Sequence, residues 1–269
     1  CDRVGIAVPS DNGYELFTGN EVGAMLLEYI CSERTKMGTM PADPVAVKTI
    51  VTTDIAAKIA KEYGVKLIEV LTGFKFIGEQ IGFLEDKGQE DRYIFGFEES
   101  YGYLAGSYVR DKDAVVASML ICEMAAFYRT KGISLIQARE NMYKKYGVYV
   151  HSQSSFVCEG VTGMERMKEI MSDLRTNTPK TIGGLTVTRF EDYLASTSVD
   201  TATGAKTMLT LPKSDVLTFK LTDGASVIIR PSGTEPKIKA YYTTTGTTKA
   251  EAAALEKTIS DDFAKILGF

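Results

Sequence analysis

The sequence has few of the residues that dominate metal and acyl-transfer chemistry, and each shortage excludes a class of site. It contains no tryptophan, one histidine and four cysteines. The cysteines are far apart and form no C-x-x-C pair, which argues against zinc and disulfides and predicts reduced thiols in a cytoplasmic protein. His151 lies in a strand pattern beside polar residues, so a structural role is expected and a histidine-based triad is not.

A basic excess and a long apolar run are also missing. The chain has 31 basic and 35 acidic residues, a formal net charge of −4, which argues against a nucleic-acid surface. The longest apolar stretch, residues 114–128, contains Glu123 and is too short to span a bilayer, so it indicates a buried helix. There is no P-loop and no Gly-x-Gly-x-x-Gly fingerprint. We therefore expect neither a nucleic acid nor a membrane as partner.

The chain starts without an initiator methionine or a signal peptide. Residues 1–10 have the pattern of one strand, and a turn signal follows at residues 11–13. Because a natural domain rarely begins inside a strand, we expect a fragment of a longer protein, in which this strand belongs to preceding structure.

The remaining composition is that of an ordinary globular protein, and its pattern changes at Gly147. The 269 residues are 44% hydrophobic and 25% charged, enough for about two domains. Before Gly147, strand patterns alternate with helical ones, which predicts an α/β domain. Its strands are expected at 46–51, 65–70 and 91–95, and its helices at 18–31, 55–63, 74–84, 112–130 and 134–145.

After Gly147 the pattern predicts a smaller α+β domain. Three segments alternate between apolar and polar residues, which is typical of antiparallel strands. The expected elements are a strand at 148–159, a helix at 163–175, threonine-rich strands and loops at 183–215, strands at 216–221, 227–230 and 238–242, and a helix at 249–267. The predicted fold class is therefore α/β: an α/β/α domain with a mixed sheet, followed by a smaller α+β domain with an antiparallel sheet.

Residues 230–237, with the sequence RPSGTEPK, lie between two expected strands and have the composition of a phosphate site. The arginine can hold phosphate oxygens through two parallel charge-assisted hydrogen bonds, and Ser232 and Thr234 add hydroxyl donors. Gly233 permits the positive φ that turns successive N–H groups towards an anion. Glu235 would repel a phosphate and should face away. The alternative is a tight surface hairpin with a solvated arginine.

Residues 96–102, with the sequence GFEESYG, follow an expected strand and place two carboxylates and a hydroxyl between glycines. Ionised carboxylates accept hydrogen bonds from vicinal sugar hydroxyls, which predicts a sugar-binding loop. The two glutamates could also form a general acid/base pair or bind a metal. The alternative without function is a solvated acidic turn.

Lys75 is expected at the start of a helix, where a cation is disfavoured unless an anion lies close. This predicts a partner for a phosphate or for a transferring proton, and the alternative is an exposed lysine in a first turn. Asp2 and Arg3 could be the end of an acidic metal loop, although two residues alone do not define one.

Five segments occur in the order found in the α-D-phosphohexomutases, the phosphoglucomutase/phosphomannomutase superfamily. Over essentially all its length, the chain resembles the C-terminal part of that family. The segments are Cys1-Asp2-Arg3, like the end of a D-x-D-x-D-R metal loop; Thr18-Gly19-Asn20-Glu21, like the entry to the third domain; Thr72-Gly73-Phe74-Lys75, like a T-G-aromatic-Lys loop; Glu98-Glu99-Ser100, like the sugar-specificity loop; and Arg230-Pro231-Ser232-Gly233-Thr234, like the phosphate loop.

The resemblance implies an enzyme of four domains. Residues 1–17 would be a remnant strand of domain 2, residues 18–147 domain 3, and residues 148–269 domain 4. It implies an isomerase that moves phosphate between the C1 and C6 oxygens of a hexose through a phosphoserine and a bisphosphate intermediate, with Mg²⁺ held by three aspartates. The implied partners are a small-molecule sugar phosphate and the missing N-terminal domains of the same protein.

The resemblance also implies roles for individual residues. Asp2 would be the last of the three metal ligands, and Arg3 and Lys75 would be catalytic. The sugar hydroxyls would be bound by Glu98 and Ser100, with Glu99 in support. The phosphate that is not reacting would be bound by Arg230, Ser232, Gly233, Thr234 and Lys237.

Some family features are missing or altered. No T-A-S-H-N-P phosphoserine loop is present, and two of the metal aspartates would precede residue 1, so we expect no mutase turnover from this chain alone. Phe97 replaces a common glycine. Phe74 replaces a histidine of some dual-specificity phosphomannomutases, and this difference favours a glucose-type mutase. The alternatives are a phosphopentomutase or aminosugar phosphate mutase on the same scaffold, or a non-catalytic phosphosugar-binding module.

Overall fold

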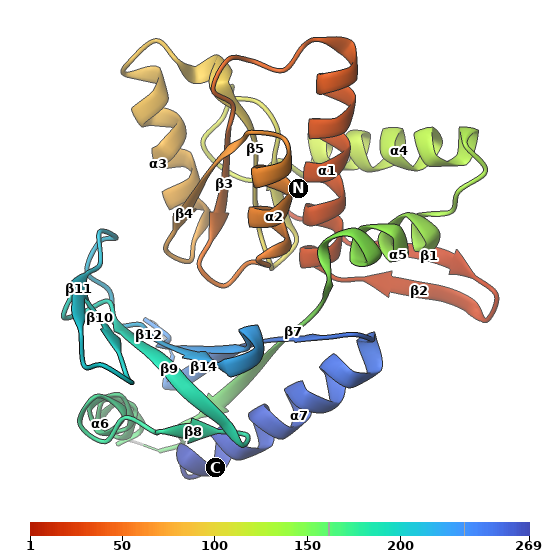
Figure 1. Cartoon of the computed structure of the whole chain (residues 1–269). Coiled ribbons are helices and arrows are strands. Elements are labelled where there is room, and N and C mark those ends of the chain that lie inside the picture. Colours follow the sequence, from red (N-terminus) through yellow and green to blue (C-terminus); the bar gives the residue numbers. More distant parts are fainter. Residues whose placement is uncertain (161, 234) are drawn as a thin grey trace. The chain divides into compact units, whose positions relative to one another are not determined.

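The computed structural model describes residues 1–160, 162–233 and 235–269, and the chain divides into two units (Figure 1). Unit 1 is Cys1–Gly147 and unit 2 is Val148–Phe269. Each unit has its own sheet and its own hydrophobic cluster. Within the described residues, no helix combines the length and the apolar character that crossing a membrane requires.

Unit 1 is built on a four-stranded mixed sheet of order β4-β3-β5-β6. β3 is parallel to both β4 and β5, whereas β6 is antiparallel to β5. The elements of the unit are β1 (Ile6–Ser10), β2 (Gly13–Phe17), α1 (Gly19–Met37), β3 (Val45–Thr49), α2 (Ile55–Glu62), β4 (Lys66–Val70), α3 (Phe74–Glu85), η1 (Glu90–Arg92), β5 (Tyr93–Glu98), β6 (Gly102–Leu104), α4 (Ala114–Thr130) and α5 (Leu135–Tyr146).

Helices cover both faces of this sheet, because its central strands have no polar face. Every residue of β3 and β5 is buried. On β5, Gly96 faces Ile77 of α3, and the next residue, Phe97, faces Gly23 of α1. Successive strand residues point to opposite faces, so α3 lies on one face, and α1, with α2 beside it, lies on the other (Figure 1). The predicted α/β/α domain with a mixed sheet is confirmed.

Helix α1 begins where the sequence indicates and ends later. The Thr18 side chain accepts a hydrogen bond from the Glu21 N–H, and the Glu21 carboxylate accepts one from the Thr18 N–H, which forms a capping box. The apolar periodicity stops at Cys31, but the helix continues through polar residues to Met37 and ends at Gly38, which has φ 67°. The helix residues after Cys31 are not buried in the core, so this part of the helix has no apolar periodicity.

Two expected strands of unit 1 start at least two residues later in the structure. Residues 90–92 form a 3₁₀ turn, so β5 starts at Tyr93, two residues later than expected, and runs to Glu98. Of residues 1–10, only Ile6–Ser10 forms a strand, and the turn after Ser10 folds Gly13–Phe17 back against it. The prediction that residues 1–17 are the remnant of a preceding domain stays a prediction.

Unit 2 is an antiparallel sheet with helices packed against it. The strand order is β11-β10-β9-β12-β13-β14-β7, and β8 pairs with β9. The elements are β7 (Val148–Val157), α6 (Gly163–Thr176), β8 (Thr181–Ile182), β9 (Leu185–Asp192), β10 (Thr197–Asp200), β11 (Lys206–Met208), β12 (Leu217–Leu221), η2 (Thr222–Gly224), β13 (Ser226–Pro231), β14 (Lys237–Gly246) and α7 (Lys249–Ile266). The predicted α+β domain with an antiparallel sheet is confirmed.

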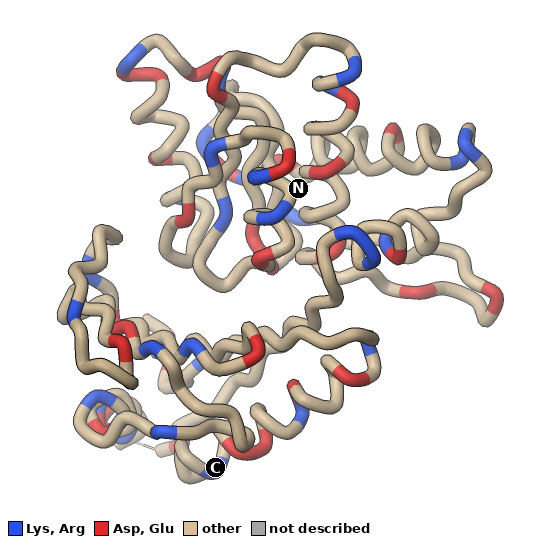
Figure 2. The backbone as a smooth tube through the Cα atoms, viewed as in Figure 1, with Lys and Arg blue, Asp and Glu red and all other residues tan. Residues whose placement is uncertain are grey.

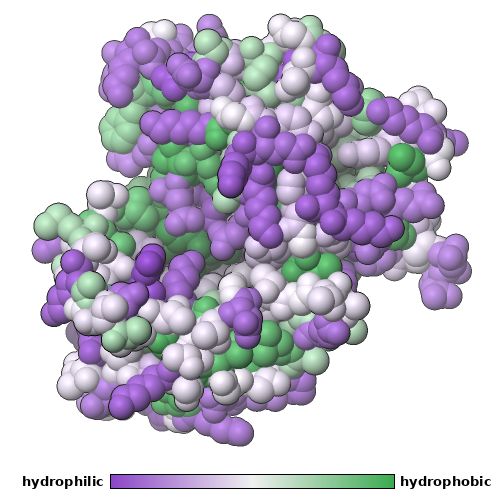
Figure 3. Space-filling model, in the orientation of Figure 1, coloured by the Kyte–Doolittle hydropathy of each residue, from purple (hydrophilic) through white to green (hydrophobic). Residues whose placement is uncertain are grey.

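Charged side chains are interspersed along both units (Figure 2), whereas the two hydrophobic clusters lie inside them. Basic and acidic residues are interspersed along both units in the view of Figure 2. Hydrophilic side chains cover most of the visible surface in Figure 3, with hydrophobic ones in scattered patches. The two hydrophobic clusters lie inside the units and include Phe74 and Ile77 in unit 1 and Phe219 and Phe263 in unit 2.

Candidate functional site

In unit 1 two loops follow the carboxyl ends of parallel strands. β4 ends at Val70 and leads into residues 71–75, and β5 ends at Glu98 and leads into residues 99–101. Both strands are parallel to β3, so the two loops lie at the same edge of the sheet. Open α/β sheets bind their ligands at this edge. The structure therefore brings both sequence-predicted loops of this unit to one place.

Glu98 is buried at this edge and lies beside cations. Its side chain is 5% exposed, and its Oε1 lies 3.5 Å from Nη2 of Arg3. The backbone of Arg3 forms an isolated β-bridge with Gly102. A Cβ on Gly102 would lie 2.8 Å from Oε1 of Glu98 and 2.5 Å from Cδ of Lys112. The missing side chain at Gly102 therefore allows a carboxylate and two cations to converge.

Lys112 belongs to this site and was missed by the sequence analysis. Its side chain is 11% exposed, and its Nζ lies 2.7 Å from Oδ1 of Asp111 and 3.7 Å from Oδ2 of Asp2. The same ammonium lies 5.3 Å from the centre of the Phe74 ring. The available signal was a charged run at residues 110–113, between the Glu98 loop and an apolar helix. We call Asp2, Arg3, Glu98 and Lys112 the edge cluster.

Asp2 does not by itself fit a Mg²⁺ site. Its side chain is 55% exposed, and its Oδ2 lies 3.4 Å from Nη1 of Arg3 and 3.7 Å from Nζ of Lys112. Mg²⁺ prefers a near-octahedral set of oxygen ligands. Among the described residues, no three acidic, histidine or cysteine side chains come together in a way that could hold a metal. The described part of this chain therefore provides no complete metal site of its own.

The loop that carries Glu99 and Ser100 is held from two sides. The carbonyl of Tyr101, a residue with φ 65°, accepts a hydrogen bond of 3.2 Å from the Val4 N–H. On the other side, a Cβ on Gly19 would lie 2.1 Å from the Glu99 carbonyl oxygen, so only glycine lets the start of α1 approach this closely. Glu99 and Ser100 are half-buried, and the loop presents them from a fixed backbone.

Lys75 lies on the first turn of α3, and among the described residues no hydrogen bond or ion pair joins it to the edge cluster. It is exposed, and its Nζ lies 4.8 Å from the centre of the Phe76 ring. The N-cap residue, Gly73, supplies no side-chain hydrogen bond to the helix start. The Oγ1 of Thr72 is buried and has no hydrogen-bond partner among the described residues. An uncapped helix N-terminus attracts anions, so the start of α3 favours a negatively charged group.

In unit 2 Arg230 lies near the end of β13, on the sheet face away from the helices. Ile229 and Ala240 are buried in the core with residues of α6 and α7, so their neighbours Arg230 and Lys239 lie on the other face, directly opposite each other. Like charges in such a pair destabilise a sheet unless an anion lies close. The Nε of Arg230 is buried without a hydrogen-bond partner among the described residues. This pair therefore favours an anionic ligand.

The turn after β13 departs from one expectation. The Ser232 N–H donates a hydrogen bond of 2.8 Å to the Lys237 carbonyl. Gly233 is exposed to open space, but its φ lies outside the positive region, so the expected positive-φ nest at this residue is wrong. Lys237 forms an ion pair with Glu235, and this hydrogen bond lowers the pKa of the Glu235 carboxyl. Thr234 lies outside the described residues.

These features define an α/β protein with a charged cluster at the carboxyl edge of a mixed sheet and a cationic turn on an antiparallel one. Residues 18–146 match the family described as phosphoglucomutase/phosphomannomutase, alpha/beta/alpha domain III. Residues 174–261 match the phosphoglucomutase/phosphomannomutase C-terminal domain. The chain belongs to the phosphoglucomutase/phosphomannomutase family and corresponds to its third and fourth domains.

Individual relatives share this chain's sequence and fold over part of their own length. A Staphylococcus aureus phosphoglucomutase (strain bovine RF122 / ET3-1) is 37% identical over 242 residues, which are 90% of this chain and 42% of that protein. The open form of the Paramecium phosphoglucomutase parafusin has a TM-score of 0.68 and 20% identity, over 99% of this chain and 43% of the other. The first relative shows kinship in sequence, and the second shows the fold alone. The chain thus spans less than half the length of both.

Proposed function

We propose that this chain is the substrate-binding half of a phosphoglucomutase-type isomerase that interconverts hexose 1-phosphate and hexose 6-phosphate. The observation that carries the proposal is the edge cluster, in which the buried Glu98 lies beside Arg3 and Lys112 at the carboxyl edge of the sheet. Such a group suits a ligand with both hydroxyls and phosphate. The hydroxyls donate to the carboxylate, and the cations attract the phosphate.

In this proposal the loop after β5 recognises the sugar. The contact between Glu98 and Arg3 is long, 3.5 Å, and involves only Oε1, so the carboxylate keeps acceptor capacity for vicinal hydroxyls. The Ser100 hydroxyl can donate or accept at the same loop, with Glu99 in support. The fixed backbone supports this role because an ordered loop loses less conformational entropy when the sugar binds.

The turn after β13 is proposed to bind the phosphate that is not reacting. The opposed pair of Arg230 and Lys239 supports this, because a phosphate would neutralise charges that otherwise repel each other. Ser232 and Gly233 would contribute a hydroxyl and an accessible backbone, and Thr234 remains part of the proposal. Lys237, already paired with Glu235, is the weaker contributor.

The proposed reaction begins with a phosphoserine elsewhere in a longer protein, which gives its phosphoryl group to the bound sugar. The resulting bisphosphate reorients in the site and transfers its other phosphoryl group back to the same serine, which restores the phosphoserine and leaves the isomeric hexose phosphate. Arg3 and Lys112 would stabilise the charge of the transferring group, and Lys75 would act as an acid/base or electrostatic helper. Mg²⁺ is proposed as a cofactor of that longer protein, with Asp2 as one ligand and the others outside this chain.

The test is conversion of glucose 1-phosphate to glucose 6-phosphate by the longer protein that is proposed to contain this chain. Glu98→Gln should lower kcat/KM by about 10- to 150-fold, the scale of a hydrogen bond to a charged group. Glu79→Gln, at an exposed position of α3, is the matched control and should leave kcat/KM unchanged. If both variants behave alike, Glu98 has no part in the reaction.

Activity and binding assays on the same longer protein distinguish the alternative functions. Rates on glucose, mannose, ribose and N-acetylglucosamine phosphates would distinguish a glucose-type mutase from a phosphopentomutase or an aminosugar phosphate mutase. A protein that binds these compounds without converting any of them would be a non-catalytic phosphosugar-binding module, and the isomerase proposal would fail.

A further inference from the structure

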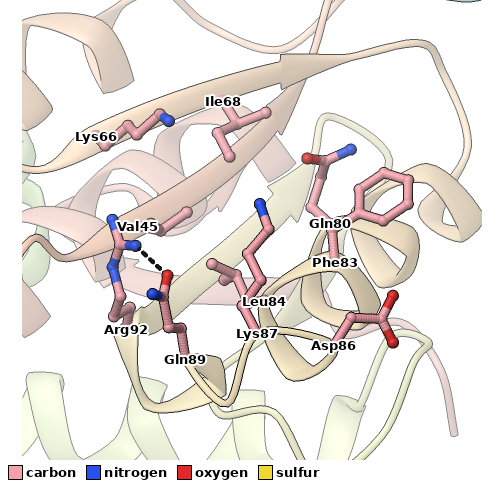
Figure 4. Close-up of a pocket in the computed structure, with 10 residues that line it drawn as sticks. All are labelled: Val45, Lys66, Ile68, Gln80, Phe83, Leu84, Asp86, Lys87, Gln89 and Arg92. Atoms are coloured by element: carbon pink, nitrogen blue, oxygen red, sulfur yellow. Dashed lines mark hydrogen bonds between the residues drawn. The ribbon is translucent and has the colours of Figure 1, made fainter.

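A cleft with a cavity of about 290 Å³ opens beside β4 at the other end of the unit 1 sheet (Figure 4). It is lined by the first residues of β3 and β4, Val45 and Lys66, and by Arg92, which precedes β5. The edge cluster lies beyond the carboxyl ends of the same strands. A strand of five residues is ~17 Å long, so the cleft is distinct from the proposed substrate site.

The cleft exists because a crossover helix leaves the edge strand partly uncovered. α3 packs mainly against β3 and β5, whereas β4 lies at the edge of the sheet. Ile68 of β4 is only half-buried, and Phe83 on α3 is 49% exposed. Figure 4 shows Ile68 on the strand side of the cleft and Phe83 on the helix side. The cleft therefore has an apolar surface that no other part of unit 1 covers.

Three cations line the same cleft without a compensating carboxylate. Lys66, Lys87 and Arg92 form no ion pair with any described residue. Arg92 is held by neutral groups: its Nε donates to a backbone carbonyl at 2.9 Å, and its Nη1 donates to Oε1 of Gln89 at 2.6 Å. Asp86 also lines the cleft, but its carboxylate points away from Lys87 and Arg92 in Figure 4. The cleft therefore carries uncompensated positive charge.

We propose that this cleft binds a small phosphorylated metabolite, with its phosphate among the three cations and its organic part against Ile68 and Phe83. Clustered cations in a concave site raise the local potential for an anion, and the planar guanidinium of Arg92 matches phosphate oxygens. The volume suits a compact ligand, since sites for drug-sized molecules start at ~300 Å³.

Two other electrostatic effects act at the cleft, and both are weaker than the attraction between the three cations and a phosphate. The C-terminal end of α3 carries roughly half a negative charge and Asp86 adds one more, which together oppose an anion but are outweighed by three full positive charges. Lys87, just beyond the helix, also stabilises that helix end. A role limited to helix stabilisation would account for Lys87 alone, and it would not account for Lys66 and Arg92 around the same cavity.

The test is a titration of the whole chain with phenyl phosphate, followed by the backbone amide signals in NMR. This probe joins a phosphate to a planar apolar group, and benzoate serves as its carboxylate counterpart. Phenyl phosphate should shift the amide signals around residues 66 and 84–89, with benzoate at least about tenfold weaker. The double variant Lys66→Gln/Lys87→Gln should weaken the phenyl phosphate effect by a similar factor and leave the remaining signals in place.

The matched control is Lys61→Gln/Lys144→Gln, which removes two exposed lysines outside the cleft and should bind like the unaltered chain. Three results would overturn the proposal: no shifts around the cleft, equal binding of benzoate, or equal weakening in the control. Shifts of the Ser232 and Gly233 amides report on the proposed substrate site separately, so either proposal can fail without the other.

Discussion

Single residues in unit 1 keep their charge in buried positions because several partners converge on each of them. Lys48 on β3 is 2% exposed, and its Nζ lies 3.0 Å from Asp54 and 2.6 Å from Glu69. Burial acts to lower the pKa of Lys48, but the two carboxylates together raise it above its usual value. Removing one partner of such a buried group is costly, so Lys48 fixes the loop that precedes α2.

Asp113 gives a pH-dependent prediction. It caps α4: its Oδ1 accepts hydrogen bonds from the N–H groups of Val115 and Val116, and its Oδ2 accepts one from the Tyr108 hydroxyl. The Tyr108 hydroxyl, followed by these backbone donors, lowers the pKa of Asp113 below its ordinary 3.8. A carboxyl with a depressed pKa in the folded state stabilises the fold above its unfolded pKa, and this contribution is lost as the pH falls through the folded pKa.

Asp113→Asn keeps the cap but removes its titration and its charge. At pH 7 the variant should be less stable by about 0.3–1 kcal/mol, the scale of a charge at a helix N-terminus. That difference should shrink as the pH falls below 3.8, the ordinary pKa of the aspartate. Urea unfolding at several pH values measures it. A difference that stays constant across the acid range would contradict this account of Asp113.

Sequence patterns identified most of the proposed site residues but not all of them. Glu98 and Arg230 stand in short motifs whose residue types match their proposed ligands, so the sequence is enough to find them. Lys112 was missed because its place depends on tertiary packing: its side chain comes near Glu98 in the space left by Gly102. Gly233 shows the opposite error, since a glycine permits a positive φ without requiring it.

At the scale of elements, close packing of α1 on the sheet depends on Gly23. A Cβ at this position would lie 2.0 Å from a ring carbon of Phe97, which is itself buried. Gly23→Ala should therefore lower the free energy of unfolding by about 1–3 kcal/mol, despite the better helix propensity of alanine.

The matched control for this substitution is Gly82→Ala on α3, where a Cβ would meet nothing within 4 Å. It should raise the free energy of unfolding by roughly 0.5–1 kcal/mol, the gain in helix propensity. Urea unfolding of both variants separates packing from propensity. If Gly23→Ala stabilises the chain as Gly82→Ala does, the contact between α1 and β5 is not tight.

Helices and strands with a pattern in their own sequence could be predicted, whereas strands that form only because they pair with a neighbouring strand could not. The helical pattern from residue 18 and the alternation in β13 and β14 predicted α1 and two strands of unit 2. β6 has only three residues, Gly102–Leu104, and exists because it pairs with β5, so no local pattern indicates it. For the same reason the end of β5 was placed too early, at residue 95 instead of Glu98.

At the scale of the whole molecule, two units each contribute a motif to one proposed function. Unit 1 has the edge cluster and the loop after β5, and unit 2 has the cationic turn after β13. The order of motifs along the chain predicted the family, because such a set is far more specific than any single motif. Which sugar the protein prefers depends on contacts that short motifs do not encode.

The central claim is that both loops bind the same phosphorylated hexose. Its most direct test is a calorimetric titration of the chain with glucose 1,6-bisphosphate. Arg230→Ala and Glu98→Gln should each weaken the same binding event by about 10- to 150-fold, whereas Arg129→Ala, at an exposed position of α4, should not. Unchanged affinity in Arg230→Ala, or a result in which the two variants weaken two different binding events, would contradict the claim.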